Sequence, residues 1–123
     1  MNHIAIAFLL LLAAASLAGC TSAPAAGQEI ARDSIRAHFE HHGDWSPGLG
    51  CYEKVTGYAY NTGTEGTAPV MLDFNLIDIR TQTVRDSRIV YLDTLEPGQS
   101  RTFETDLDGE CVQDYRVEGT VVP

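Results

Sequence analysis

From residue 34 onward, apolar and polar residues alternate in short runs, which is the pattern of β-strands with one buried face. The alternation is clearest near the end of the chain, where Tyr115, Val117, Gly119 and Val121 are separated by polar residues. In residues 70–79, every second position up to residue 76 is apolar. The predicted strands are residues 34–41, 51–60, 70–79, 83–93, 100–107 and 114–121.

Turn-forming residues separate these runs, with Gly and Pro gathered at residues 46–50, 61–69 and 97–98. Four consecutive apolar residues at 89–92 break the alternation, which indicates burial on both faces or a β-bulge. Asp108-Gly109 is a favourable turn pair and predicts a hairpin. Short strands at this spacing predict an all-β fold, an immunoglobulin-like antiparallel β-sandwich of about six or seven strands.

Residues 29–42 fit two patterns. Ala31, Ile35 and Phe39 would share one face of a helix, whereas Ile35, Ala37 and Phe39 would share one face of a strand. We favour the strand, because all later segments are strands and such a sheet needs a second layer of the same kind.

The first 19 residues carry no Asp, Glu, Lys or Arg, and residues 4–17 form an almost unbroken apolar run. The run is shorter than the roughly 20 residues that span a bilayer and has the length typical of a secretory signal. Leu17-Ala18-Gly19-Cys20 resembles the lipobox of prokaryotic lipoproteins. The resemblance implies cleavage before Cys20 and attachment of acyl chains such as palmitate, which together give stable anchoring. The alternative is an ordinary signal peptide followed by an incidental cysteine.

The chain therefore divides into a lipoprotein signal peptide at residues 1–19, a tether at 20–29 and one small domain at 30–123. The tether is predicted to be flexible because its small residues bury too little apolar surface to offset the entropy of ordering. We expect a protein anchored to a membrane through the lipid on Cys20 and exposed outside the cytoplasm, at the cell surface or in the periplasm.

The formal net charge is −9, and every Asp, Glu, Lys and Arg lies after residue 20. This charge argues against nucleic acid as a partner, since phosphates favour a basic surface. It also argues against electrostatic adhesion to anionic lipid headgroups.

Two cysteines remain once Cys20 carries the lipid. Outside the cytoplasm such a pair, Cys51 and Cys111, predicts a disulfide. The alternatives are two free thiols or a two-thiolate metal site, although neither cysteine has a partner at the C-x-x-C spacing of many zinc sites.

Four short motifs in residues 55–121 together resemble the FxLYD-type domain, an immunoglobulin-like module of extracytoplasmic prokaryotic proteins. The naming motif is FNLID at 74–78, with isoleucine where the family has tyrosine. The others are VTG at 55–57, NTG at 61–63 and LEPG at 95–98, before a phenylalanine at 103. The resemblance implies the sandwich fold and an accessory module without an assigned reaction.

Tyr52, Tyr58 and Tyr60 share one face of their strand, opposite the face expected to enter the core. Such an aromatic stripe is typical of a binding surface. The alternative is that the tyrosines pack under the strand at 34–41 or under a loop. Trp45 is expected to close one end of the sandwich rather than to stack on a ligand.

Two segments carry groups that bind metals elsewhere. His38, Glu40 and His42 would share a strand face, and imidazoles with a carboxylate suit Zn²⁺ or Cu²⁺. The alternative is a polar strand edge. Residues 106–110 alternate acids around a glycine, as calcium loops do, but lack the twelve-residue loop.

We expect a non-catalytic binding or scaffolding module of the cell envelope, without a cofactor, that contacts an envelope protein or ligand. His41, Asp44 and Ser46 lie too close in sequence to converge as a catalytic triad, so the chain is not expected to be an enzyme. The competing hypothesis is an envelope metal-binding protein that uses His38 and its neighbours.

Overall fold

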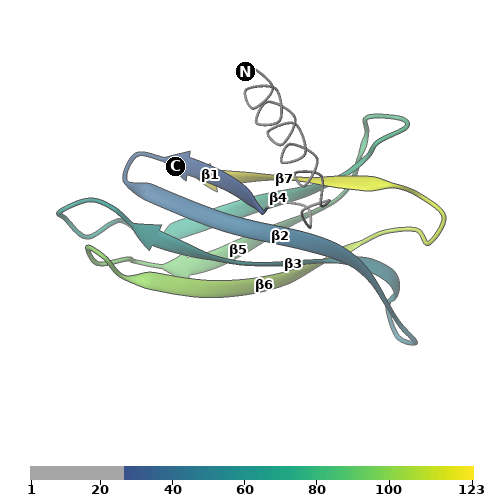
Figure 1. The fold of residues 1–123 in the computed structure, drawn as a ribbon, viewed down its shortest axis with the longest axis horizontal. Coiled ribbons are helices and arrows are strands. Elements are labelled where there is room, and N and C mark those ends of the chain that lie inside the picture. Colours follow the sequence, from purple (N-terminus) through teal and green to yellow (C-terminus); the bar gives the residue numbers. More distant parts are fainter. Residues whose placement is uncertain (1–26) are drawn as a thin grey trace, which may run out of the picture.

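The computed structural model describes residues 27–123, and every regular element in that part of the chain is a β-strand, as predicted. The strands are β1 (Gln28–Arg32), β2 (Ile35–Ser46), β3 (Gly50–Asn61), β4 (Val70–Asp78), β5 (Val84–Asp93), β6 (Ser100–Asp108) and β7 (Tyr115–Val122) (Figure 1). The predicted segments correspond to β2 to β7. Within residues 27–123 we find no helix with the length and apolar character that crossing a membrane requires.

The strands form two antiparallel sheets, one ordered β1-β2-β3-β6 and the other β5-β4-β7. Figure 1 shows the sheets as two stacked layers. The chain changes layer between β3 and β4, between β5 and β6, and between β6 and β7. Each layer joins strands that are distant in the chain, β3 with β6 in one and β4 with β7 in the other, as in an antiparallel β-sandwich. The predicted fold class is therefore confirmed.

Three phenylalanines from both layers form the centre of the core. Phe74 lies edge-on to Phe39 with ring centroids 5.0 Å apart, and 5.5 Å from Phe103. Gly57 and Gly119 leave room for these rings: a Cβ at Gly57 would come within 2.9 Å of Phe103, and one at Gly119 within 2.9 Å of the other two rings. The remaining buried apolar residues are Ile35, Ala37, Val55, Ala59, Val70, Leu72, Leu76, Ile77, Leu92, Leu95, Leu107, Val117 and Val121.

The ambiguous segment at 29–42 folds as two antiparallel strands, because β1 pairs with the first half of β2 from Gln28↔Phe39 to Arg32↔Ile35. Strand β1 was not predicted, since Ile30 is its one large apolar residue. It overlaps the expected tether at residues 28–29. The rest of that tether up to residue 26, with the signal peptide and Cys20, lies outside the described residues.

Asn61 explains why the NTG motif ends β3. Its side chain is 1% exposed and donates hydrogen bonds to the carbonyl oxygens of Glu65 (2.7 Å) and Leu95 (3.0 Å). Its Oδ1 accepts a hydrogen bond from the Gly63 N–H at 2.8 Å. Buried polar groups need such partners, so this residue joins the loop after β3 to the segment that precedes β6.

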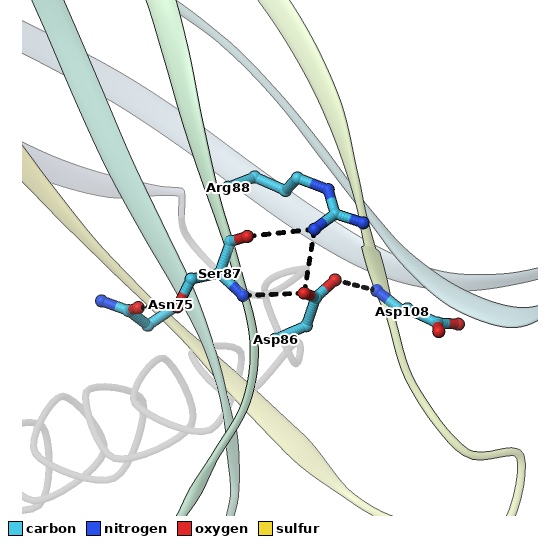
Figure 2. Close-up of polar contacts among 5 residues, drawn as sticks. All are labelled: Asn75, Asp86, Ser87, Arg88 and Asp108. Carbon is cyan, nitrogen blue, oxygen red and sulfur yellow. Dashed lines mark hydrogen bonds and ion pairs between the residues drawn. The ribbon is translucent and has the colours of Figure 1, made fainter.

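Strand β5 has register shifts against β4 at both ends. The shift opposite Val70 and Met71 is the β-bulge expected near residues 89–92, and the alternative of burial on both faces is wrong, because Tyr91 is 73% exposed. Beside the bulge near Ile77, the Asp86 carboxylate accepts hydrogen bonds from the Asp108 N–H (2.7 Å) and the Arg88 side chain (2.9 Å) (Figure 2). Arg101 adds a hydrogen bond from β6 to the carbonyl oxygen of Leu92 on β5. Side chains therefore join β5 and β6, the edge strands of the two sheets, which no backbone ladder connects.

The predicted disulfide between Cys51 and Cys111 is present, with the Cα atoms 5.1 Å apart. It links the start of β3 to the connection between β6 and β7. The predicted hairpin at Asp108-Gly109 is wrong, because β6 and β7 belong to different sheets. The turn pair instead begins the crossing between the layers, and the disulfide anchors that crossing.

Candidate functional site

The outward face of the four-stranded sheet carries the tyrosines singled out in the sequence. Val55 and Ala59 on β3 are fully buried, so the alternate positions Tyr52, Tyr58 and Tyr60 point away from the core. Strand β2 lies beside β3 in the same sheet and does not cover these side chains. The alternative of tyrosines packed beneath that strand is therefore wrong.

Tyr58 and Tyr60 lie together with a histidine from the neighbouring strand. His38 is the register partner of Tyr58, and their ring centroids are 5.2 Å apart. Tyr60 lies 6.1 Å from the His38 ring and 6.0 Å from Tyr58, with all three planes within 29° of one another. We call His38, Tyr58 and Tyr60 the aromatic cluster. Tyr58 is 43% exposed, so part of the cluster is open to solvent.

Polar groups surround the aromatic cluster. The Glu29 carboxylate of β1 lies 3.2 Å from His38 Nε2, and Thr102 of β6 is the register partner of Tyr58. A shallow cavity of about 260 Å³ lies beside Tyr58 and extends to Thr56 and Gly57. Aromatic rings with accessible hydroxyls offer a partner both apolar area and hydrogen bonds, so this face is suited to recognition.

Tyr52 lies apart from the cluster, near the other end of β3. Its register partners are Asp44 on β2 and Asp108 on β6. Partial removal from solvent, together with the charge of Asp44, raises the pKa of Tyr52. The backbone N–H of Trp45, 2.8 Å from the Asp44 carboxylate, is the main cause that lowers the pKa of Asp44. A salt bridge to Glu104 at 2.9 Å raises the pKa of Lys54, the next outward residue on β3.

The possible metal ligands are not brought together. Successive residues of a strand rise by about 3.3 Å, so the backbones of His38 and His42 are separated by about 13 Å. His38 instead contacts Glu29, while Glu40 and His42 are exposed. Among residues 27–123, no three His, Cys, Asp or Glu side chains are grouped so that they could hold a metal ion, and this includes the acids at 106–110.

Two features at the β2–β3 hairpin escaped sequence reasoning. Trp45 does not close the sandwich, as was expected, but is 61% exposed. His41 Nδ1 and Glu53 Oε1 are 2.6 Å apart, on the sheet face that elsewhere enters the core. The alternation with Val55 places Glu53 on that face and was available as a signal. The alternation alone could not show that the β2–β3 hairpin extends beyond the edge of the other sheet.

Comparisons of the sequence and of the structure with known proteins found no matching family model, no matching curated protein and no matching solved structure.

Proposed function

We propose that this chain is a lipid-anchored, extracytoplasmic and non-catalytic binding module that uses the outward face of its four-stranded sheet to bind a component of the cell envelope. The membrane attachment is the lipid on Cys20, and the partner docks on the aromatic cluster. Immunoglobulin-like sandwiches serve many functions, so the proposal depends on this surface and not on the fold.

Three features of the sequence and fold support the cellular location. Leu-Ala-Gly-Cys follows an apolar run at the start of the chain. The Cys51–Cys111 disulfide is of the kind that persists in oxidising compartments. The likeness of residues 55–121 to FxLYD-type accessory modules supports a role in the envelope without a reaction of its own.

The observation that carries the binding role is the exposure of Tyr58 within a cluster of three neighbouring aromatic rings. Tyrosine and other aromatic residues contribute disproportionately to protein interfaces, because they bury a large area at a low cost in side-chain entropy. Glu29 and the threonines around the cluster form a polar rim of the kind that surrounds such centres.

The test compares capture of envelope components by the anchored full chain and by the double variant Tyr58→Ala/Tyr60→Ala. Detergent-solubilised envelope from the native source is cross-linked, captured and compared by quantitative mass spectrometry. We expect the component captured by the wild type to fall by about tenfold or more with the double variant. The matched control is Tyr91→Ala, which removes a tyrosine that is 73% exposed on the other sheet.

Thermal unfolding of each variant separates binding from folding. The proposal predicts melting temperatures within a few degrees of the wild type, because the cluster lies outside the core. Equal capture by the wild type and the double variant would reject the surface as the binding site. The anchor is tested separately by mass spectrometry of the mature N-terminal peptide, where an unmodified Cys20 would reject lipidation.

A further inference from the structure

A second surface feature lies at the other end of β3 from the aromatic cluster. A cavity of about 450 Å³ separates the end of the β2–β3 hairpin from the connection between β6 and β7. Trp45 and Glu53 line it from the hairpin, and Glu110 and Tyr115 line it from the opposite side. The Cys51–Cys111 disulfide lies in the same wall.

The walls of this cavity are held in place before any ligand binds. The disulfide joins the two sides, and the Gly109 N–H donates to the Cys51 carbonyl oxygen at 3.3 Å. The Tyr115 hydroxyl accepts a hydrogen bond from the Glu110 N–H at 2.9 Å, which fixes the ring against the connection. A site built in advance loses less entropy when a ligand binds.

The exposed indole of Trp45 is the most unusual part of the cavity. Trp45 is the register partner of Cys51, so its ring begins next to the disulfide, yet 61% of the residue remains in contact with solvent. A cavity of about 420 Å³ at the opposite end of the sandwich, around residues 63–70, has no aromatic residue among its lining residues. The aromatic wall therefore distinguishes the cavity at the disulfide from the one at the opposite end of the sandwich.

The charge of the cavity is one-sided. Asp44, Glu53 and Glu110 contribute carboxylates, and none of the described residues that line it is Lys or Arg. Basic groups do lie near these carboxylates: His41 is bonded to Glu53, and a guanidinium nitrogen of Arg85 is 3.8 Å from Glu110. The charges of His42 and Lys54 also contribute to the lowered pKa of Asp44, although the backbone N–H of Trp45 is the main cause. The net charge of −9 on the whole chain adds to the attraction for a cation.

We propose that this cavity binds an organic ammonium group, with the cation against the indole of Trp45 and the carboxylates of Glu53 and Glu110 balancing its charge. Tryptophan is the most favourable aromatic partner for such cations, and carboxylates nearby select against anions. The cavity has the size of a small-molecule site. This site is separate from the proposed binding face, so either proposal can fail without the other.

The chain contains one tryptophan, so its fluorescence reports directly on this cavity. The full chain in detergent is titrated with spermidine, which carries primary and secondary ammonium groups, and with choline, which carries a quaternary one. Sodium chloride at matched ionic strength and neutral glucose serve as controls. We expect a saturable change in emission with at least one amine below about 10 mM, and no saturable change with either control. Tighter binding of spermidine would mean that the carboxylates contribute most to the affinity. Tighter binding of choline would mean that the indole does.

Variants then locate the bound cation. Glu53→Gln/Glu110→Gln is expected to weaken binding by about tenfold or more, whereas Glu104→Gln, on the outward sheet face, changes it by less than about twofold. Trp45→Leu, followed by calorimetry, is expected to lose binding while the melting temperature stays near that of the wild type. If the double variant is less stable, Glu110→Gln alone is used, since Glu110 is exposed. Failure of both amines to saturate, or unchanged affinity in the carboxylate variants, would overturn the proposal.

Discussion

The Cys51–Cys111 disulfide is expected to supply a large part of the stability of this domain. The perturbation is the double variant Cys51→Ala/Cys111→Ala, which keeps Cys20 for the anchor. Cys111 is exposed and Cys51 is only half-buried, so the loss of the two sulfur atoms leaves little empty space in the core. The effect should therefore arise mainly in the unfolded chain, where the bond restricts conformational freedom.

The size of the effect follows from the separation of the two cysteines, which is 60 residues. Closing a loop of this length removes chain entropy worth about 4 kcal/mol at 25 °C. Small domains have unfolding free energies of about 5–15 kcal/mol, so the loss is substantial. At about 4–8 °C per kcal/mol, the melting temperature should fall by about 15–30 °C.

The assay is thermal unfolding followed by circular dichroism, with chemical denaturation as a second measure. Each single variant, Cys51→Ala or Cys111→Ala, should lose about as much stability as the double variant, because one bond is removed in every case. A reducing agent should lower the melting temperature of the wild type to that of the double variant and leave the variant unchanged. A double variant that melts within about 5 °C of the wild type would refute the reasoning.

Two further predictions concern the polar contacts of the sheets. Asp86→Ala removes the acceptor for the Asp108 N–H between β5 and β6. Urea denaturation should show an unfolding free energy lower by about 1–2 kcal/mol. Hydrogen exchange at the Asp108 amide should become faster, and an unchanged exchange rate would contradict the prediction. The pKa of Lys54 is raised by Glu104, so the contribution of this pair to stability is present below the unfolded pKa and is lost as the pH rises through the folded pKa. NMR titration of Glu104→Gln should show a lower Lys54 pKa than the wild type, and an equal value would count against the pair.

Local patterns were sufficient to predict most strands. The alternation of Val117 and Val121 with polar neighbours identifies β7, and both residues are buried. Strand β1 was missed because Ile30 is flanked by polar and small residues, and its pairing with β2 is what makes it a strand. Asp108-Gly109 was misinterpreted because a turn pair favours a chain reversal without specifying whether the next strand pairs with the previous one.

The candidate site was less accessible to sequence reasoning than the fold. The alternation along β3 was enough to predict that Tyr58 and Tyr60 share one face, but it did not predict that His38 of β2 lies beside them. Tyr52 shares that parity and yet lies near Asp44, away from the cluster. Contacts between strands depend on the register, which the pattern of a single strand does not contain.

The amino-acid order alone was enough to indicate an all-β chain, its inward residues and, through an even pair of cysteines, its disulfide. These properties depend on local alternation, turn chemistry and composition, which act within a few residues of the chain. The assignment of strands to two layers, the meeting of His38 with the tyrosines and the cavity beside Trp45 arose from packing between distant segments. The contact of His38 with Tyr58 depends on the register between β2 and β3, and the cavity depends on how the β2–β3 hairpin lies against the connection between β6 and β7. Neither arrangement exists until the strands have assembled.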